Sequence, residues 1–382
     1  MSFVGGAGDF DAAGRIRNPD DFDKQIEGTM ANLAEALASE ACTFDDVVRL
    51  KAHYTAERDD WEVIAALARF FKADPCQRSV RSRSPCSPSP AKLYKFKLLP
   101  SAAGGRIPKS ERSRAPYRLR GKRYSVSERS LGACAGEFIA VANRAAEDVD
   151  GVVGQPDDGV AQSHFIIEKH AETLAALGAS FQDCVKLEGY YFGNTREQWA
   201  PLSKARASHF REPGPAGTVV PCHRLNPKGA LTKVEVLAMR ELRNGCDKYI
   251  PREDHWPARV WDWTYPTPCR QAIRLRNTVW LGGQVPSEPY CNKGHSVMEG
   301  QLMPQTRVTM SYIQNLLRAF GRSLADLKLM VCYFTETIAF AKTLADCVGG
   351  ALPPMTARAE ANDAQSQDYR GDLGRRSRLT AL

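Results

Sequence analysis

An internal repeat constrains this chain more than any other feature of its sequence. Three thirty-residue segments, which begin at Gln25, Gln162 and Gln305, match one another without a gap. Each has Thr or Ser eighteen residues after its Gln and Asp three residues later, in the pairs Thr43 and Asp46, Ser180 and Asp183, and Ser323 and Asp326. Unrelated amphipathic segments would rarely keep three polar positions in register, so we expect three copies of one folding module.

The spacing of apolar residues predicts how each copy folds. Apolar residues of the first copy recur at intervals of four, three and four, which places them on one helical face: Ile26, Met30, Leu33 and Leu37. The Thr-x-x-Asp step that follows predicts a turn that ends the helix. From residue 48 to residue 54 the apolar period is two, which is typical of a strand. In the third copy this strand is apolar on both faces, so we expect it to be central.

Two further elements complete the predicted unit. A short apolar strand that ends near glycine precedes each of these helices, as in residues 3–6 and 279–283. A second amphipathic helix follows in the first copy, from Trp61 to Phe71. Each unit is thus predicted to run strand, loop, helix, strand, helix, strand. This order gives a mixed sheet with two helices on one face, an α+β fold class.

The repeat divides the chain into three units and two atypical segments. Units 1, 2 and 3 are expected at residues 1–75, 124–245 and 246–354. Residues 76–123 contain 14 Lys or Arg and one acid, so the rest of a chain of net charge +8 carries −5. This segment is either a disordered basic linker or an out-of-frame translation that replaces the last strands of unit 1. Residues 355–382 are expected to form an irregular tail.

The three copies resemble the RidA/YjgF family, whose members are also called L-PSP endoribonucleases. The first copy carries the resemblance in FVGGAGDF and residues 25–54, and the third in WLGGQVP and residues 305–327. The second copy carries it in PGPAGTVVPCHRLNPKGALTKVEVLAM. The resemblance implies a chorismate-mutase-like α+β unit that normally forms a homotrimer with ligand clefts between its subunits. Three such units in one chain would allow an intramolecular pseudo-trimer.

The resemblance also implies a reaction. Members of the family hydrolyse reactive enamines and imines, such as 2-aminoacrylate, to keto acids and ammonia without a metal or organic cofactor. An arginine in a Pro-Ala-Arg-Thr step holds the substrate carboxylate there, a task that suits its planar fork. Gly217 and Met355 stand at that position in the second and third copies. We therefore expect degenerate active sites.

Two residues remain as candidate catalytic groups. Glu235 matches the acidic residue of the family, and Arg224 on the preceding strand could bind a carboxylate from another direction. Both also have plainer interpretations, as a salt-bridged and a solvated side chain. The resemblance places ligand contacts at the glycine-rich strand ends and at the former arginine position: Gly5, Gly6, Gly217, Gly282, Gly283 and Gln284. His170 takes a place in the helical stripe, which favours a core histidine over a catalytic base.

Other features limit the partners. The eleven cysteines include no CxxC pair, and Cys291 with His295 lacks a second pair, so neither disulfides nor a metal site are expected. No run approaches the roughly 18 apolar residues that span a bilayer, and no basic-then-apolar leader opens the chain. We therefore expect a cytoplasmic protein without a membrane partner. Missing strands would expose sheet edges that allow self-association.

Three functions remain in competition. The first is an enamine or imine deaminase with degenerate sites. The second is a non-catalytic relative that binds small carboxylate metabolites and serves in regulation. The third is an RNA-associated protein, for which the basic segment 76–123 predicts only non-specific, salt-sensitive binding.

Overall fold

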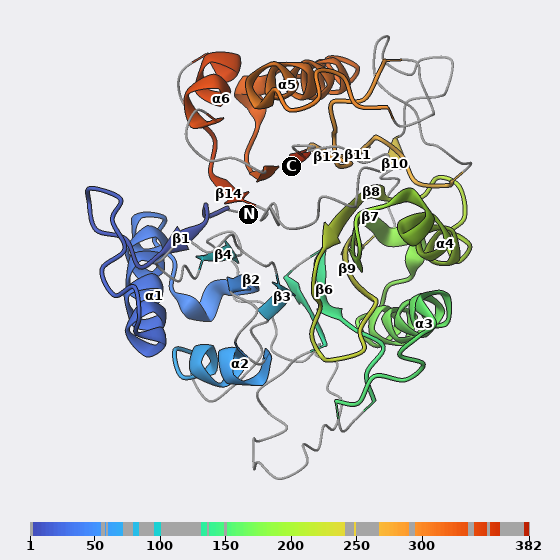
Figure 1. Ribbon diagram of the computed structural model, residues 1–382, viewed down its shortest axis with the longest axis horizontal. Coiled ribbons are helices and arrows are strands. Elements are labelled where there is room, and N and C mark those ends of the chain that lie inside the picture. The colour runs from blue at the N-terminus through green and yellow to red at the C-terminus, as the bar shows by residue number, and fades with distance from the viewer. Residues whose placement is uncertain are drawn as a thin grey trace.

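The chain forms three α+β units that lie around a common centre, with the helices on the outside and the strands inside (Figure 1). This is seen in a computed structural model of the chain. The structure describes residues 3–54, 58, 60–71, 79–83, 95–100, 131–135, 137–148, 151–240, 248–249, 267–289, 295–334, 340–349, 352–359 and 378–381. Within these residues, none of the helices combines the length and the apolar character needed to cross a bilayer.

Unit 1 packs two helices against a mixed sheet. Its elements are β1 (Ala7–Gly8), α1 (Phe22–Ser39), β2 (Val47–Tyr54), α2 (Asp60–Ala68), β3 (Ser79–Arg83) and β4 (Lys95–Pro100). The strand order is β1-β4-β2-β3, in which β3 runs parallel to β2 and β4 runs antiparallel. The predicted apolar face of α1 is confirmed, because all four of its residues are fully buried in the core of this unit.

Unit 2 repeats this arrangement. Its elements are β5 (Gly132–Ala135), β6 (Phe138–Arg144), α3 (Gly159–Ala176), β7 (Cys184–Phe192), α4 (Arg196–Ala207), β8 (Ala216–Cys222) and β9 (Thr232–Met239). The sheet has the order β5-β6-β9-β7-β8, with β8 parallel to β7 and β9 antiparallel to it. His170 of α3 is buried, and its Nε2 lies 2.9 Å from the carbonyl oxygen of Val234. This agrees with the core role predicted for His170.

Unit 3 divides its strands between two sheets. Its elements are β10 (Lys248–Tyr249), β11 (Ala272–Leu275), β12 (Thr278–Leu281), α5 (Leu302–Arg318), β13 (Met330–Phe334), α6 (Phe340–Val348), β14 (Met355–Ala359) and β15 (Arg378–Ala381). One sheet is β10-β11-β12 and the other is β14-β13-β15. The strand of the third copy, β13, pairs on both sides as its two apolar faces predicted.

The residues that define the repeat have the same structural roles in all three units. Each initial Gln donates from Nε2 to a carbonyl oxygen of the loop before its helix, over 2.6 Å for Gln25, 2.9 Å for Gln162 and 3.0 Å for Gln305. Each Thr or Ser forms a capping box with its Asp around a short 3-10 turn. The turns are Phe44–Asp46, Phe181–Asp183 and Leu324–Asp326. Equivalent residues therefore lie in like surroundings.

Parts of the two atypical segments supply strands. β3 and β4 lie within residues 76–123, and β14 and β15 lie within residues 355–382, where a linker and an irregular tail were expected. In the parallel pairs, Leu50 faces Ser79, Leu187 faces Gly217 and Met330 faces Met355. The first members are equivalent in the repeat, so the second members are too. The sequence SVRSR of β3 has no alternating apolar pattern, and periodicity could not reveal such a strand.

Backbone contacts join neighbouring units at equivalent places. The amide of Gly283 in unit 3 donates to the carbonyl of Gly217 in unit 2 over 2.9 Å. The amide of Gly6 in unit 1 donates to the carbonyl of Met355 in unit 3 over 2.9 Å. At the remaining junction, β3 of unit 1 lies beside β6 of unit 2. The three units thus contact one another in a closed ring.

The junction between units 2 and 3 depends on glycine. A Cβ atom on Gly282 would lie 2.9 Å from the carbonyl oxygen of Gly217 and 3.2 Å from that of Gln271. Neither backbone oxygen can move easily, so we predict that Gly282→Ala lowers the free energy of unfolding by about 1–3 kcal/mol. The control is Gly154→Ala, whose Cβ would meet its nearest neighbour at 4.0 Å. Chemical denaturation that gives equal stabilities for the two variants would contradict this.

Candidate functional site

Glu235 lies in a buried cluster of charged side chains at the centre of the ring. It sits on β9 directly opposite Glu188 of β7, which places two carboxyl groups side by side. Unit 1 supplies the cations from β2: Lys51 Nζ lies 2.8 Å from Glu235 Oε1 and 2.5 Å from Glu188 Oε2. Arg49 forms a short ion pair with Glu235 Oε1 and lies 3.8 Å from Glu188 Oε2. These four side chains bridge units 1 and 2.

A third cation completes what we call the central charge cluster, namely Arg49, Lys51, Lys186, Glu188 and Glu235. Lys186 of β7 is buried, and its Nζ donates to the carbonyl oxygen of Leu281 in unit 3. Tyr190 accepts from Lys51 and packs in one apolar group with Tyr333 of β13. Glu235 comes from β9, whereas the other members of the cluster and Tyr333 come from β2, β7 and β13, the equivalent strands of the three units.

Burial raises the pKa of both carboxyl groups in this cluster, and the neighbouring cations lower it. Burial raises the pKa of Glu235 to about 7, since the proximity of Glu188 adds to burial and the pull of Arg49 and Lys51 does not fully offset it. Burial acts the same way on Glu188, but Lys51 and Arg49 outweigh it and hold the pKa of that carboxyl well below its usual value. One carboxyl of the pair thus keeps its charge more firmly than the other.

The predicted ligand-contact residues meet at the unit junctions. Gly282 and Gly283 lie against the strand position of Gly217, and Gln284 Nε2 donates to Gln271 Oε1 over 2.7 Å. Both glutamines are fully buried. Gly5 and Gly6 lie against Met355 in the same way. The glycines allow backbone to approach backbone between units, so the geometry around them is that of a packed junction.

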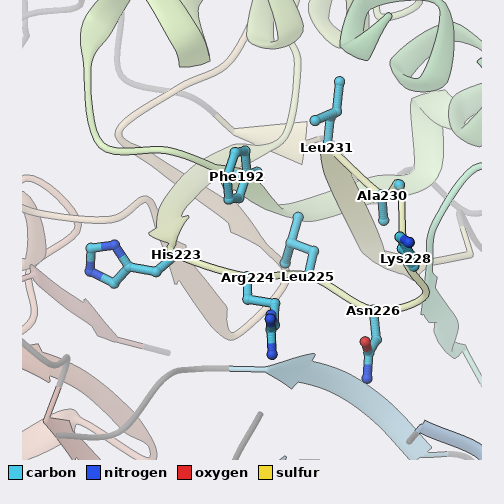
Figure 2. Close-up of a pocket in the computed structure, with 9 residues that line it drawn as sticks. Phe192, His223, Arg224, Leu225, Asn226, Lys228, Ala230 and Leu231 are labelled. Carbon is cyan, nitrogen blue, oxygen red and sulfur yellow. The ribbon is translucent and has the colours of Figure 1, made fainter. Parts of the chain in front are cut away.

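Arg224 lies apart, on the loop that joins β8 to β9. The loop borders a pocket of about 630 Å³, whose lining includes Phe192, His223, Arg224, Leu225, Lys228 and Leu231 (Figure 2). Arg224 and Lys228 are exposed, and Glu235 is not part of the lining. The two candidate catalytic residues therefore occupy different environments. Among the described residues, no group of three or more His, Cys, Asp or Glu side chains is arranged to hold a metal ion.

Sequence reasoning missed the cations that neutralise Glu235. Arg49 and Lys51 alternate with the apolar residues of β2, and on an isolated sheet that face would be solvated. Only the packing of three units turns it inward. A usable signal existed, because Arg49 and Lys186 occupy the same repeat position, and Lys51 and Glu188 occupy another with opposite charge.

Comparisons with known proteins agree with this architecture. No family model matches the chain. A RutC family protein of Sulfurisphaera tokodaii is 30% identical over 69 residues, which are 18% of this chain and 53% of that protein. The chain spans little more than half the length of the curated relatives it matches. Over this part of its length the chain is related to the RutC family proteins.

Two solved structures are similar to this chain over different shares of its length. RidA from the Antarctic bacterium Psychrobacter sp. is 20% identical with a TM-score of 0.27, and the match covers 33% of this chain and 100% of that one. A chorismatase is 13% identical with a TM-score of 0.50, and the match covers 100% of this chain and 99% of that one. The second likeness shows that the fold of the whole chain occurs in a solved protein.

The buried amine of Lys186 gives the site a measurable pH dependence. Burial lowers the pKa of Lys186 from its usual 10.5 to about 8. Between these values the unfolded chain binds more protons at this lysine than the folded one, so its contribution to stability rises with pH. We predict that the wild type gains stability relative to Lys186→Met between pH 8 and 10.5, as measured by urea denaturation. A constant difference over this range would show that Lys186 titrates normally.

Proposed function

We propose that the three units take the place of the separate subunits of a RidA-type homotrimer. The proposed units are residues 1–75, 124–245 and 246–354, with strands from residues 76–123 and 355–382 completing the sheets of units 1 and 3. The equivalent junctions at Gly283 with Gly217 and at Gly6 with Met355 support this proposal. A chain of this kind forms its own ring.

We further propose that the protein binds small carboxylate metabolites and does not hydrolyse enamines by the constellation of the family. The occupied carboxylate of Glu235 carries this proposal. A group that positions water must reach the substrate, and Glu235 is 1% exposed with Arg49 and Lys51 on one of its oxygens. Glycine and methionine at the former arginine position also remove the usual clamp for the substrate carboxylate.

Enamine or imine deamination is the alternative. A carboxyl group with a pKa of about 7, as burial gives Glu235, would suit acid-base catalysis if a substrate could reach it. RNA association ranks third, because the basic segment that suggested it lies mainly outside the described residues. The described cysteines are free thiols, which fits the proposed cytoplasmic location.

The choice of probes follows from the chemistry of the relatives. Pyruvate is the keto acid that 2-aminoacrylate hydrolysis would release, so it tests the carboxylate site and the family reaction together. The chorismatase acts, by its name, on chorismate, which is itself a carboxylate metabolite. Both compounds therefore belong in a binding panel, with glycerol as an uncharged control.

The expected result is stabilisation without turnover. A bound carboxylate should raise the free energy of unfolding by about 2.7 kcal/mol at a hundredfold excess over Kd, seen as a higher Tm. Freshly generated 2-aminoacrylate should decay to ammonia and pyruvate at its spontaneous rate. Faster release that is lost in a folded Glu235→Gln variant would establish the deaminase instead. If no carboxylate raises Tm, the binding proposal is wrong.

A further inference from the structure

The loop between β8 and β9 is held in place from three directions. Gln162, the repeat residue of unit 2, donates from Nε2 to the carbonyl oxygen of Gly229 over 2.9 Å and accepts from the amide of Leu231 over 2.8 Å. The amide of Phe192 at the end of β7 donates to the carbonyl oxygen of Leu231 over 2.9 Å. Asn226 donates to the carbonyl oxygen of Arg58 in unit 1 over 3.2 Å. A loop fixed in this way is suited to bind a ligand without large rearrangement.

The pocket that this loop borders has an apolar side and a cationic side. Figure 2 shows Leu225 pointing toward Phe192, while Arg224 extends from the same loop to the opposite side. Phe192 is 46% exposed, which leaves much of a large apolar surface uncovered. Lys228 lies further along the loop, and none of the described residues that line the pocket is acidic.

The charge of this pocket favours an anion. Within the described part of the chain, Arg224 and Lys228 take part in no ion pair, whereas Arg49 and Lys51 of the central charge cluster are paired with carboxylates. A guanidinium fork or an ammonium group that borders a pocket suits the oxygens of a carboxylate.

The size and apolar side of the pocket favour a ligand larger than pyruvate. Pockets of about 300–1,000 Å³ accommodate drug-sized molecules, and the volume here, about 630 Å³, is in that range. A three-carbon acid would leave the exposed surface of Phe192 and Leu231 uncovered. A carboxylate with a ring-sized apolar body would contact both sides at once.

We infer that this pocket binds a carboxylate that carries an aromatic or similar apolar ring, of the aryl 2-oxo acid class. The inference rests on the proposed carboxylate binding and adds its location and its ligand class. Arg224 and Lys228 supply the positive charge that attracts the carboxylate, and Phe192 with Leu231 covers the ring.

Three matched probes test separately whether binding needs the ring and whether it needs the carboxylate. Phenylpyruvate has both the ring and the carboxylate, pyruvate lacks the ring, and phenylacetone lacks the carboxylate. Isothermal titration of the full chain should give a Kd for phenylpyruvate at least about tenfold below that for pyruvate, since burial of a ring contributes that much or more. Phenylacetone should bind at least about tenfold more weakly than phenylpyruvate, because it leaves the cations unpaired.

Variants assign the binding to this pocket. Arg224→Gln with Lys228→Gln should raise the Kd for phenylpyruvate about tenfold or more, and Phe192→Ala should reduce the preference over pyruvate. The matched control, Arg322→Gln with Lys328→Gln, removes two exposed cations of unit 3 and should leave Kd unchanged. Equal Kd values for phenylpyruvate and pyruvate, or unchanged binding in the Arg224 and Lys228 variant, would overturn the inference alone. Failure of every carboxylate to bind would remove the proposed function as well.

Discussion

The buried ion pairs at the centre constrain everything else in this molecule. Two carboxylates and three cationic side chains lie away from water, and each would cost several kcal/mol if it lost its partners. Lys51 and Arg49 come from unit 1, and Glu188 and Glu235 come from unit 2. Because neither set can be buried alone, the two units are stable only when they are packed together.

This arrangement depends on three diverged copies in one chain. A trimer of identical subunits would place three like charges at each equivalent position around its axis, and such charges repel one another when buried. Here Lys51, Glu188 and Val331 share one position, and Arg49, Lys186 and Leu329 share another. Because the copies have diverged, the side chains at one repeat position carry opposite charges and attract one another. This attraction determines that unit 1 packs beside unit 2. Arg49 and Lys51 also pair with Glu235, so Glu235 is not open to a ligand, and we propose that ligands bind at the loop between β8 and β9.

Much of the fold could be predicted because it follows local rules. The Gln, the capping box and the apolar face of α1 act within one unit, and each leaves a pattern in the sequence. β3 could not be found, because a strand held by backbone pairing needs no particular side chains. The partners of Glu235 could not be found either, since its contact with Arg49 spans 186 residues and exists only between packed units. Arg224 was identified as a candidate from the sequence, but the sequence did not show that Arg224 lies on an exposed loop while Glu235 is buried.

A charge exchange between Lys51 and Glu188 tests the central claim most directly. Lys51→Glu and Glu188→Lys should each lower the midpoint of urea unfolding strongly, because each buries like charges side by side. The double variant restores an opposite pair at the same contact, so it should recover most of the lost stability. If the two losses simply add, the side chains do not meet, and units 1 and 2 are not joined by this cluster.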